Sequence, residues 1–569
     1  MFERRAFVRL IRLVLPSLVM LVVGLWRISG PSFWRDEAAT MSAIRRPLPV
    51  LWQMLGTTDV VHSTYYLLMW PLVRMLGTSE LGARLPSVVA VAAAAGGVAA
   101  IGRRLASERT GLAAGLTFAL LPVASRYGQE ARSYALVMAL AVLASYLLVR
   151  TIDMETSSRF WWLAYSATLA AMGWMNLMSL LIVPAHAITL ACRARMSASS
   201  APASDRYNSS PEPASGRWQR AKGRLTIEGS WRSLGMAWLA AIAATAIVVS
   251  PLIVLAWSQR HGTARFLAFT SFPAVANAPG RLTGSWPVLV AILPIAIAGF
   301  KVAGMRSGIA WLCLPWLLVP PILLLAAGAF TPIYDPRYIL FSVPALALLI
   351  GYWLDILVQR AKGMSQLNQV SKVVSNISRI AARCHITIVP GTVVVLFGVA
   401  VIGIASVPSQ LAYRAPGAHG DNIRLAAQIV ASHERPGDAV LYQPPWWRQI
   451  AAAYPYGFSR LHDISLATSP SRADNFTGTQ LPKSQIRKKL ATTRRVWLVE
   501  FQTFKPDPSL AGSWRAIARW RASTLLLVLY ERRPPIHRPA LTVSGSPSAE
   551  RKGHTPSDPF PRMSARPNM

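Results

Sequence analysis

The chain has 569 residues, of which 53% are hydrophobic and 20 are tryptophan, and this composition excludes an ordinary soluble protein. The formal net charge of +35 would indicate nucleic acid as the partner of a soluble protein, but the Lys and Arg residues lie mostly between apolar runs and in flanking tails. Basic loops beside membrane spans contact anionic lipid and determine topology. We therefore expect a lipid bilayer, and no nucleic acid, as the partner.

Apolar runs long enough to cross a membrane recur from the N-terminus to about residue 407. A helix needs about 20 apolar residues to cross a hydrocarbon core of about 30 Å. The basic N-terminus runs into the first apolar run without an evident small-residue cleavage site, which predicts an uncleaved first span. About eleven transmembrane helices are predicted, at residues 11–28, 84–101, 111–125, 134–149, 160–174, 177–191, 234–257, 286–300, 309–330, 339–357 and 386–407.

Positive residues between these runs alternate in one consistent way. If the clusters near residues 4–12, 103–109, 193–195, 301–306 and 360–383 are all cytoplasmic, the positive-inside rule is satisfied and the N-terminus lies inside. The same alternation predicts a multi-pass protein of the cell membrane whose outer segments are residues 29–83, 126–133, 259–285, 331–337 and everything after about residue 409.

One apolar segment of the first outer loop, residues 65–76, is too short to be counted as a span. Twelve helical residues reach only about 18 Å, and the segment contains Pro71 and Arg74. We predict an interfacial helix that lies flat on the outer surface of the membrane. If this segment crossed the membrane, Asp36 and Glu130 would lie on opposite sides.

The remaining chain divides into further predicted regions. Residues 193–232 are rich in Ser, Ala, Pro and Arg and predict a disordered cytoplasmic loop within a transmembrane domain of residues 1–410. Residues 411–533 predict a small extracytoplasmic α/β domain, with a helix near 421–434 that Asp421 caps and strands at 439–442, 496–501 and 525–530. The Pro-rich residues 534–569 predict a disordered tail.

Ionisable residues gather at the outer ends of the predicted spans. Charges at membrane depth are costly unless they are paired or functional, so the set indicates either local salt bridges or a functional site. Acids among several cations suit transfer from a phosphate-linked donor, because cations neutralise the leaving phosphate while a carboxylate takes a proton from the attacking hydroxyl. The set comprises Arg35, Asp36, Glu37, His62, Glu130, Arg132, Asp335 and Arg337.

These residues also carry a family resemblance. Several short motifs, in this order and spacing, resemble the GT-C membrane glycosyltransferases, and specifically the members like glycosyltransferase family 39, including actinobacterial mannosyltransferase-like members. The resemblance covers residues 11–407, and in one motif Ser63 stands where such enzymes often have a proline. The motifs are Trp34-Arg35-Asp36-Glu37-Ala38, His62-Ser63-Thr64-Tyr65-Tyr66-Leu67-Leu68, Arg84-Leu85-Pro86-Ser87, Gly128-Gln129-Glu130-Ala131-Arg132-Ser133-Tyr134 and Pro336-Arg337-Tyr338.

The resemblance implies an α-helical polytopic GT-C fold and an inverting transfer from a polyprenyl-phosphate sugar donor, with mannose or another hexose as the sugar. Asp36 would be the general base, Glu37 would orient Asp36 or the acceptor, and Glu130 would be the second acidic position. The lipid carrier and the hydroxyl acceptor, whether glycolipid, glycan or protein, stay open. Candidate residues for binding the phosphate or the substrates are Arg35, His62, Tyr66, Arg132, Tyr134, Arg337 and Tyr338.

Two questions stay open at this point. Asp36, Glu37 and Glu130 could share a divalent cation such as Mg²⁺ or Mn²⁺, because hard oxygen ligands suit these ions. A multi-pass lipid or glycolipid transporter, or flippase, is the alternative function, although such proteins usually carry ionisable residues near the middle of their spans. A scaffold or receptor with a partner-binding outer domain would tolerate substitution of Asp36 and Glu130.

Overall fold

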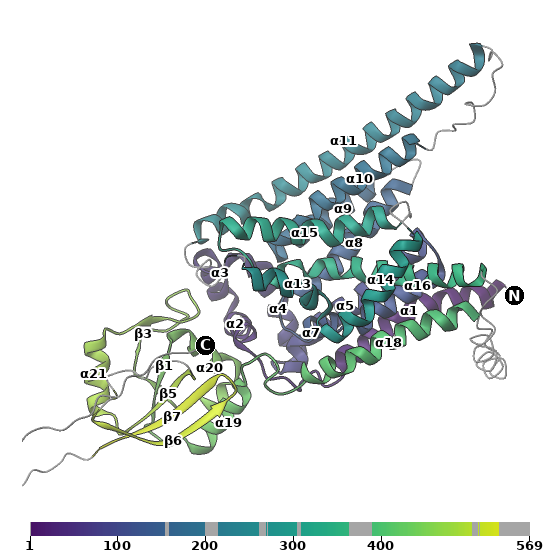
Figure 1. Ribbon diagram of the computed structural model, residues 1–569. Helices are drawn as coiled ribbons and strands as arrows, with labels where there is room; N and C mark the ends of the chain where they lie inside the picture. The colour runs from purple at the N-terminus through teal and green to yellow at the C-terminus, as the bar shows by residue number, and fades with distance from the viewer. Residues whose placement is uncertain are drawn as a thin grey trace, which may run out of the picture.

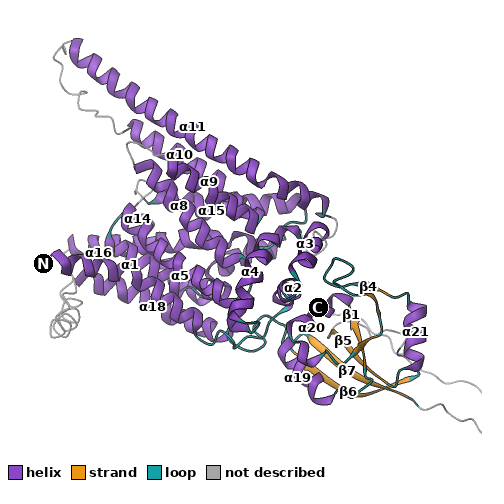
Figure 2. Cartoon of the chain, turned by 180° about the vertical axis from the view of Figure 1, so that it is seen from behind, coloured by secondary structure: helices purple, strands orange, loops and turns teal. Residues whose placement is uncertain are grey.

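The computed structural model describes residues 2–153, 159–199, 214–260, 269, 271–303, 309–363, 390–502, 510 and 512–533. It consists of a large helical body and a small region with a β-sheet, which packs against one end of the body, beside α2 and α3 (Figure 1). Seen from behind, all strands lie in this smaller region (Figure 2). The predicted tail, residues 534–569, lies outside the described residues.

Apolar sequence and length explain the helices of the body. Seven described helices are long and apolar enough to cross a membrane, or eight if the bent pair Val275–Thr283 and Trp286–Val302 is one span, so the chain is a multi-pass membrane protein. The helices of the body are α1 Phe2–Leu25, α5 Glu80–Leu105, α6 Glu108–Leu120, α7 Pro122–Gly128, α8 Tyr134–Asp153, α9 Arg159–Met175, α10 Ile182–Ser199, α11 Ala214–Ser258, α13 Phe272–Thr283, α14 Trp286–Ala303, α15 Ala310–Phe330, α16 Val343–Gly363 and α18 Pro390–Ala412, with 3₁₀ turns η2 Leu177–Leu181 and η4 Pro336–Ser342.

The predicted count of eleven spans is not confirmed. The predicted span at 111–125 is divided between α6 and α7 because Pro122 ends the hydrogen-bonding pattern of α6. The spans predicted at 11–28 and 160–174 correspond to the apolar helix Ile11–Leu25 and to the 17 residues of α9, both under the 18-residue length of the counted spans.

The composition of residues 193–232 predicted a disordered loop, but the structure contains helix at both ends of this interval. Helix α10 continues to Ser199 and α11 begins at Ala214, which leaves residues 200–213 outside the description. No proline occurs from Ala214 until Pro251, so nothing in the backbone stops the membrane helix from extending beyond the apolar run.

The first long loop is itself helical. It contains α2 Arg35–Ile44, α3 Leu48–Thr57, the 3₁₀ turn η1 Val60–His62 and α4 Ser63–Leu76. The 14 residues of α4 are too few for a span, in agreement with the sequence prediction, and its Tyr65, Tyr66 and Met69 are buried. The position of α4 on the outer surface of the membrane stays a prediction.

The C-terminal region contains a five-stranded sheet in the order β2-β1-β5-β7-β6, in which β1 pairs in parallel with β2 and β5 while β7 is antiparallel to β5 and β6. Side chains alternate along β5: Trp497 and Val499 join the large core, whereas Val496 and Leu498 pack with α21 in a second cluster. The elements are α19 Ile423–His433, β1 Ala439–Gln443, η5 Pro445–Arg448, α20 Gln449–Ala453, η6 Pro455–Gly457, β2 His462–Asp463, β3 Leu466–Thr468, β4 Thr479–Gln480, α21 Lys483–Thr492, β5 Arg495–Phe501, β6 Trp514–Ala522 and β7 Leu525–Arg532.

The predicted helix and three strands of this region are present, but the residue that caps the N-terminus of the helix differs from the prediction. Asn422, and not Asp421, caps α19, because the Asn422 side chain accepts a hydrogen bond from the Leu425 N–H. Asp421 instead accepts hydrogen bonds from Thr524 and from the backbone of Arg35. The residue predicted as a cap therefore connects the sheet to the first loop.

Candidate active site

Two adjacent acids in the first turn of α2 occupy different environments. Successive residues of a helix point about 100° apart, so Asp36 and Glu37 face different neighbours. The side chain of Glu37 is fully buried, whereas that of Asp36 keeps 25% of its surface exposed.

Glu37 forms a buried ion pair with Arg84 of α5. The Arg84 Nε and Nη2 donate to the two carboxylate oxygens at 2.8 and 2.7 Å, and its other N–H groups donate to carbonyls of residues 28–32. The Ala131 N–H donates to Glu37 at 2.8 Å. Glu37 therefore holds three chain segments together, away from solvent, and the sequence motif did not reveal its pairing with Arg84.

Asp36 forms an ion pair with Arg337, which joins residues 301 positions apart and brings together the first and last motifs of the resemblance. Arg337 also donates through Nε to both oxygens of Asp335, at 3.0 and 2.9 Å. Burial opposes ionisation of Asp36, but the surrounding arginines, led by Arg132 and Arg337, hold the pKa of that carboxyl below its usual range. Asp36 is therefore ionised at neutral pH.

Arg132 is held by a chain of hydrogen bonds behind Asp36. The Asp59 carboxylate lies 2.7 Å from the His62 Nδ1, and the Arg132 Nη2 lies 2.8 Å from the His62 Nε2. Arg is only a donor, so Nε2 accepts and Nδ1–H donates to Asp59. The Tyr66 hydroxyl donates to the other Asp59 oxygen at 2.6 Å. His62, Tyr66 and Arg132 are thus brought together around Asp59, an acid that sequence reasoning missed. Their predicted role in substrate binding stays a prediction.

Glu130 lies nearby but makes weaker contacts. Its Oε1 is 3.7 Å from the Arg126 Nε and 3.5 Å from the His419 Nδ1, and neither of its oxygens accepts a hydrogen bond from the part of the chain that the structure describes. Burial, more than any other cause, raises the pKa of Glu130 to about 7, with Glu37 and Asp36 adding to it against the effect of Arg126. Glu130 therefore titrates near neutral pH, unlike Asp36.

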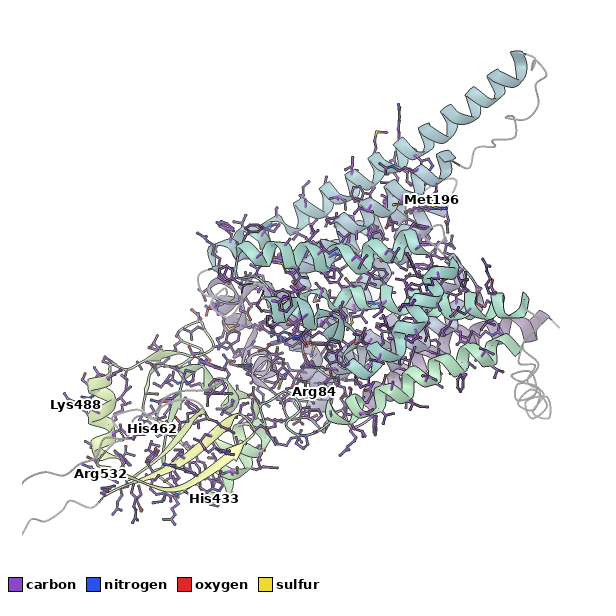
Figure 3. The ribbon with its side chains drawn as sticks, in the orientation of Figure 1. Arg84, Met196, His433, His462, Lys488 and Arg532 are labelled. Atoms are coloured by element: carbon purple, nitrogen blue, oxygen red, sulfur yellow. The ribbon has the colours of Figure 1, made fainter. Side chains whose placement is uncertain are left out.

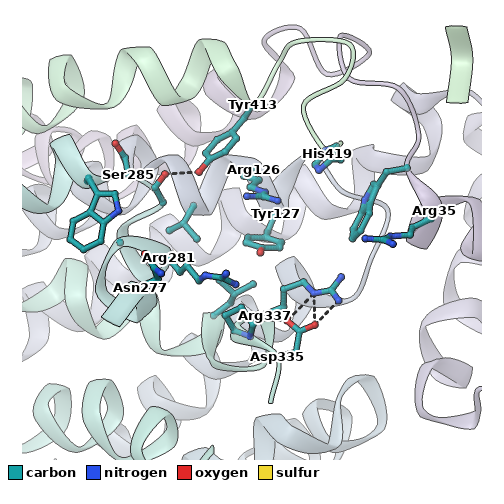
Figure 4. A pocket seen from close by; sticks show the side chains of 17 residues that line it. Arg35, Arg126, Tyr127, Asn277, Arg281, Ser285, Asp335, Arg337, Tyr413 and His419 are labelled. Atoms are coloured by element: carbon teal, nitrogen blue, oxygen red, sulfur yellow. Dashed lines mark hydrogen bonds and ion pairs between the residues drawn. The ribbon is translucent and has the colours of Figure 1, made fainter. Parts of the chain in front are cut away.

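A cavity of about 710 Å³ opens beside these groups. The described residues contribute four arginines to its wall, and Figure 4 labels all of them, Arg35, Arg126, Arg281 and Arg337. Asp335, the one acid among the described residues of the wall, is paired with Arg337. The cavity is therefore suited to an anion such as a phosphate. The polar and aromatic lining residues are Trp34, Arg35, Arg126, Tyr127, Asn277, Arg281, Ser285, Trp286, Asp335, Arg337, Tyr413 and His419.

Of the other predicted substrate residues, Arg35 lines this cavity, whereas Tyr134 and Tyr338 do not. Arg35 lines it and keeps 49% of its side chain exposed. Tyr134 is buried and packs edge-to-face on Tyr127, with the Arg337 guanidinium 5.7 Å from its ring. Tyr338 is partly buried against the core and does not line the cavity.

Several residues of the site escaped sequence reasoning. Arg126 lies four residues before Glu130, a helical spacing that could have indicated the pair. Arg281 and His419 come from segments without a recognised motif, and only the fold brings them to the cavity.

The donor set does not fit the divalent cation considered for these acids. Among the described residues, no group of three or more His, Cys, Asp or Glu side chains lies close enough to hold a metal ion. Asp36 and Glu37 are each paired with an arginine, and Glu130 lies against another.

Residues 63–203 match the model of a family described as dolichyl-phosphate-mannose-protein mannosyltransferase. Among solved structures, apo ArnT from Cupriavidus metallidurans has a TM-score of 0.56 at 14% identity, with 91% of this chain and 97% of that chain covered. Apo oligosaccharyltransferase from Archaeoglobus fulgidus has a TM-score of 0.46 at 11% identity, with 86% and 69% covered. No curated protein matches this chain.

At these sequence identities, the structural similarity shows the fold alone. The match to ArnT extends this similarity of fold over 91% of this chain. The family model adds a sequence match across residues 63–203, the segment that contains Tyr66, Glu130 and Arg132. Together they confirm the resemblance to the GT-C membrane glycosyltransferases and the predicted fold class, a helical membrane body with a small C-terminal sheet region.

Proposed function

We propose that this GT-C-like membrane glycosyltransferase transfers a hexose, of which mannose is the first candidate, from a polyprenyl-phosphate donor to a hydroxyl acceptor. The observation that carries the proposal is the ion pair between Asp36 and Arg337, because Arg337 is one of four arginines that the described residues contribute to the wall of the cavity. The family description, which names dolichyl-phosphate-mannose, supports the donor class and the sugar. Charge bias of the loops supports a site on the outer face.

The proposed reaction is a single inverting displacement. The acceptor oxygen attacks the anomeric carbon while Asp36 takes the hydroxyl proton as general base. The bond from the anomeric carbon to the phosphate oxygen breaks, and its electron pair stays on the phosphate. Arg126, Arg281 and Arg337 stabilise the charge that develops there. Glu37 contributes by fixing α2, and hence Asp36, against α5.

The test is transfer from a defined donor. Proteoliposomes containing the full chain are supplied with polyprenyl-phosphate mannose labelled in the sugar, together with membrane extract as the acceptor source, and the label is followed into products that no longer carry the polyprenyl phosphate. We expect transfer with inverted anomeric configuration, and we expect Arg281→Gln to raise the donor KM. Label that crosses the bilayer but stays on its lipid would contradict the proposal and support the flippase.

A further inference from the structure

The segment that joins α18 to α19 passes along the wall of the arginine cavity. We call residues 413–422 the linker. Its first end is fixed to the helical body: the Tyr413 hydroxyl donates to the Gly284 carbonyl at 2.5 Å, and Arg414 donates to the carbonyls of Trp26 and Val23 at 2.8 and 2.6 Å. Tyr413 and His419 both face the cavity in Figure 4.

The other end of the linker is fixed to the C-terminal sheet. At the turn between β6 and β7, the Thr524 hydroxyl donates to an Asp421 oxygen at 2.5 Å and the Thr524 N–H donates to the Gly420 carbonyl at 2.9 Å. The second Asp421 oxygen accepts from the Arg35 N–H at 3.4 Å. The sheet thus determines where the linker runs beside α2.

Between these anchors, His419 sits in a polar setting with incomplete hydrogen bonding. Its side chain is 4% exposed and stacks on Trp34, with the ring centroids 5.5 Å apart. The His419 Nδ1, the Trp34 Nε1 and both Glu130 oxygens have no hydrogen-bond partner among the described residues. Buried polar atoms are normally paired. The His419 Nδ1 and the Glu130 Oε1 lie 3.5 Å apart, so a proton between them can join the two groups, while the His419 and Trp34 side chains line the cavity.

We propose that His419 is a donor-binding residue that donates a hydrogen bond to the donor phosphate, and that Glu130 behind it orients the imidazole ring. This inference rests on the proposed function of the same site. Protonated Glu130 donates to Nδ1, so that the Nε2–H of the neutral ring is available to a phosphate oxygen. Arg126 and Arg337 lie on the same cavity wall and supply the positive charge.

The charge states of the two groups support this tautomer. Burial chiefly, with Arg84 and Arg126 adding to it, keeps the pKa of His419 well below its ordinary value, so the imidazole is neutral. Burial also raises the pKa of Glu130 to about 7, which keeps its proton available below neutral pH. The C-terminal region is therefore part of the transferase site, because its sheet positions a residue that contacts the donor.

Binding of undecaprenyl phosphate to the purified full-length protein tests this inference. His419→Phe keeps the stack on Trp34 but removes the donor, and we expect the Kd to rise about tenfold. His419→Gln restores an N–H donor and should recover most of the affinity. Thr524→Val removes an anchor of the linker and should raise the Kd about threefold. His433→Phe, on α19 away from the cavity (Figure 3), should leave the Kd unchanged.

A second experiment measures chemical modification of His419 in the wild-type protein. Undecaprenyl phosphate should protect His419 of the wild-type protein from modification by diethyl pyrocarbonate. The Arg337→Gln protein serves as the reference and should lose binding of undecaprenyl phosphate. If it does, then wild-type affinity of His419→Phe, or failure of undecaprenyl phosphate to protect His419 from modification, would overturn the role of His419. If Arg337→Gln also binds normally, the donor cavity itself is wrong and the proposed function fails with it.

Discussion

Asp36 and Glu37 are neighbours in sequence, but the fold gives them opposite environments. Glu37 lies in the interior with both oxygens bound by Arg84, whereas Asp36 keeps a quarter of its side chain exposed beside an arginine cavity. Two neighbouring acids therefore differ in their contacts: Glu37 holds the first loop on the helical body, and Asp36 is the proposed general base. Four substitutions test this contrast.

The largest effect is expected from Asp36→Asn. An amide cannot take the acceptor proton, so we expect transfer to fall by about 10²- to 10⁴-fold. Because Asp335 still pairs with Arg337, thermal stability should change little. Rates with labelled donor and unfolding curves measure the two properties separately. Undiminished transfer would reject Asp36 as the base.

Glu37→Gln should do the reverse and act mainly on stability. It leaves the fully buried Arg84 without its counter-charge, which costs about 3–5 kcal/mol. The measurement is the midpoint of thermal unfolding in detergent, and Glu434→Gln, an acid of the C-terminal region, is the matched control. A normally stable Glu37→Gln protein with impaired catalysis would instead place Glu37 among the catalytic groups.

The pH dependence of stability should distinguish Glu130 from Asp36. The pKa of Glu130 is raised from 4.5 to about 7, so its contribution is fully present below pH 4.5 and is lost as the pH rises through about 7. The pKa of Asp36 is lowered from 3.8, so its contribution is present above pH 3.8 and is lost only as the pH falls further. Glu130→Gln should flatten the melting temperature between pH 4.5 and 7, and an unchanged profile would contradict this assignment.

The smallest effect is expected from Tyr66→Phe. The change removes one hydrogen bond to the buried Asp59, which costs about 1–3 kcal/mol of stability. Because Tyr66 does not line the cavity, the donor KM should stay at the wild-type value. Initial rates across a range of donor concentrations measure this, and a raised KM would restore the substrate-binding role that its motif implies.

Much of the fold could be predicted because bilayer physics acts locally. Long apolar runs such as Trp231–Ser258 and Ala310–Phe330 are spans by length alone. The predicted number of transmembrane helices was not confirmed, partly because of proline. At Pro122 the apolar run continues, but the backbone hydrogen bonds of α6 end. The irregular composition of residues 193–232 was likewise a poor guide to the length of α11.

Hydropathy and charge are properties of each residue, so the amino-acid sequence predicted a membrane protein with acids and arginines gathered at the ends of its spans. The tertiary structure was needed to show that Asp36 pairs with Arg337 of the cavity wall while Glu37 pairs with Arg84, and that Arg281 and His419 join the site. Those outcomes depend on contacts between residues tens to hundreds of positions apart, and such contacts leave no local periodicity to read. Asp36 and Glu37 of α2 show both points, because a sequence motif located the pair and the tertiary packing gave its two members different contacts.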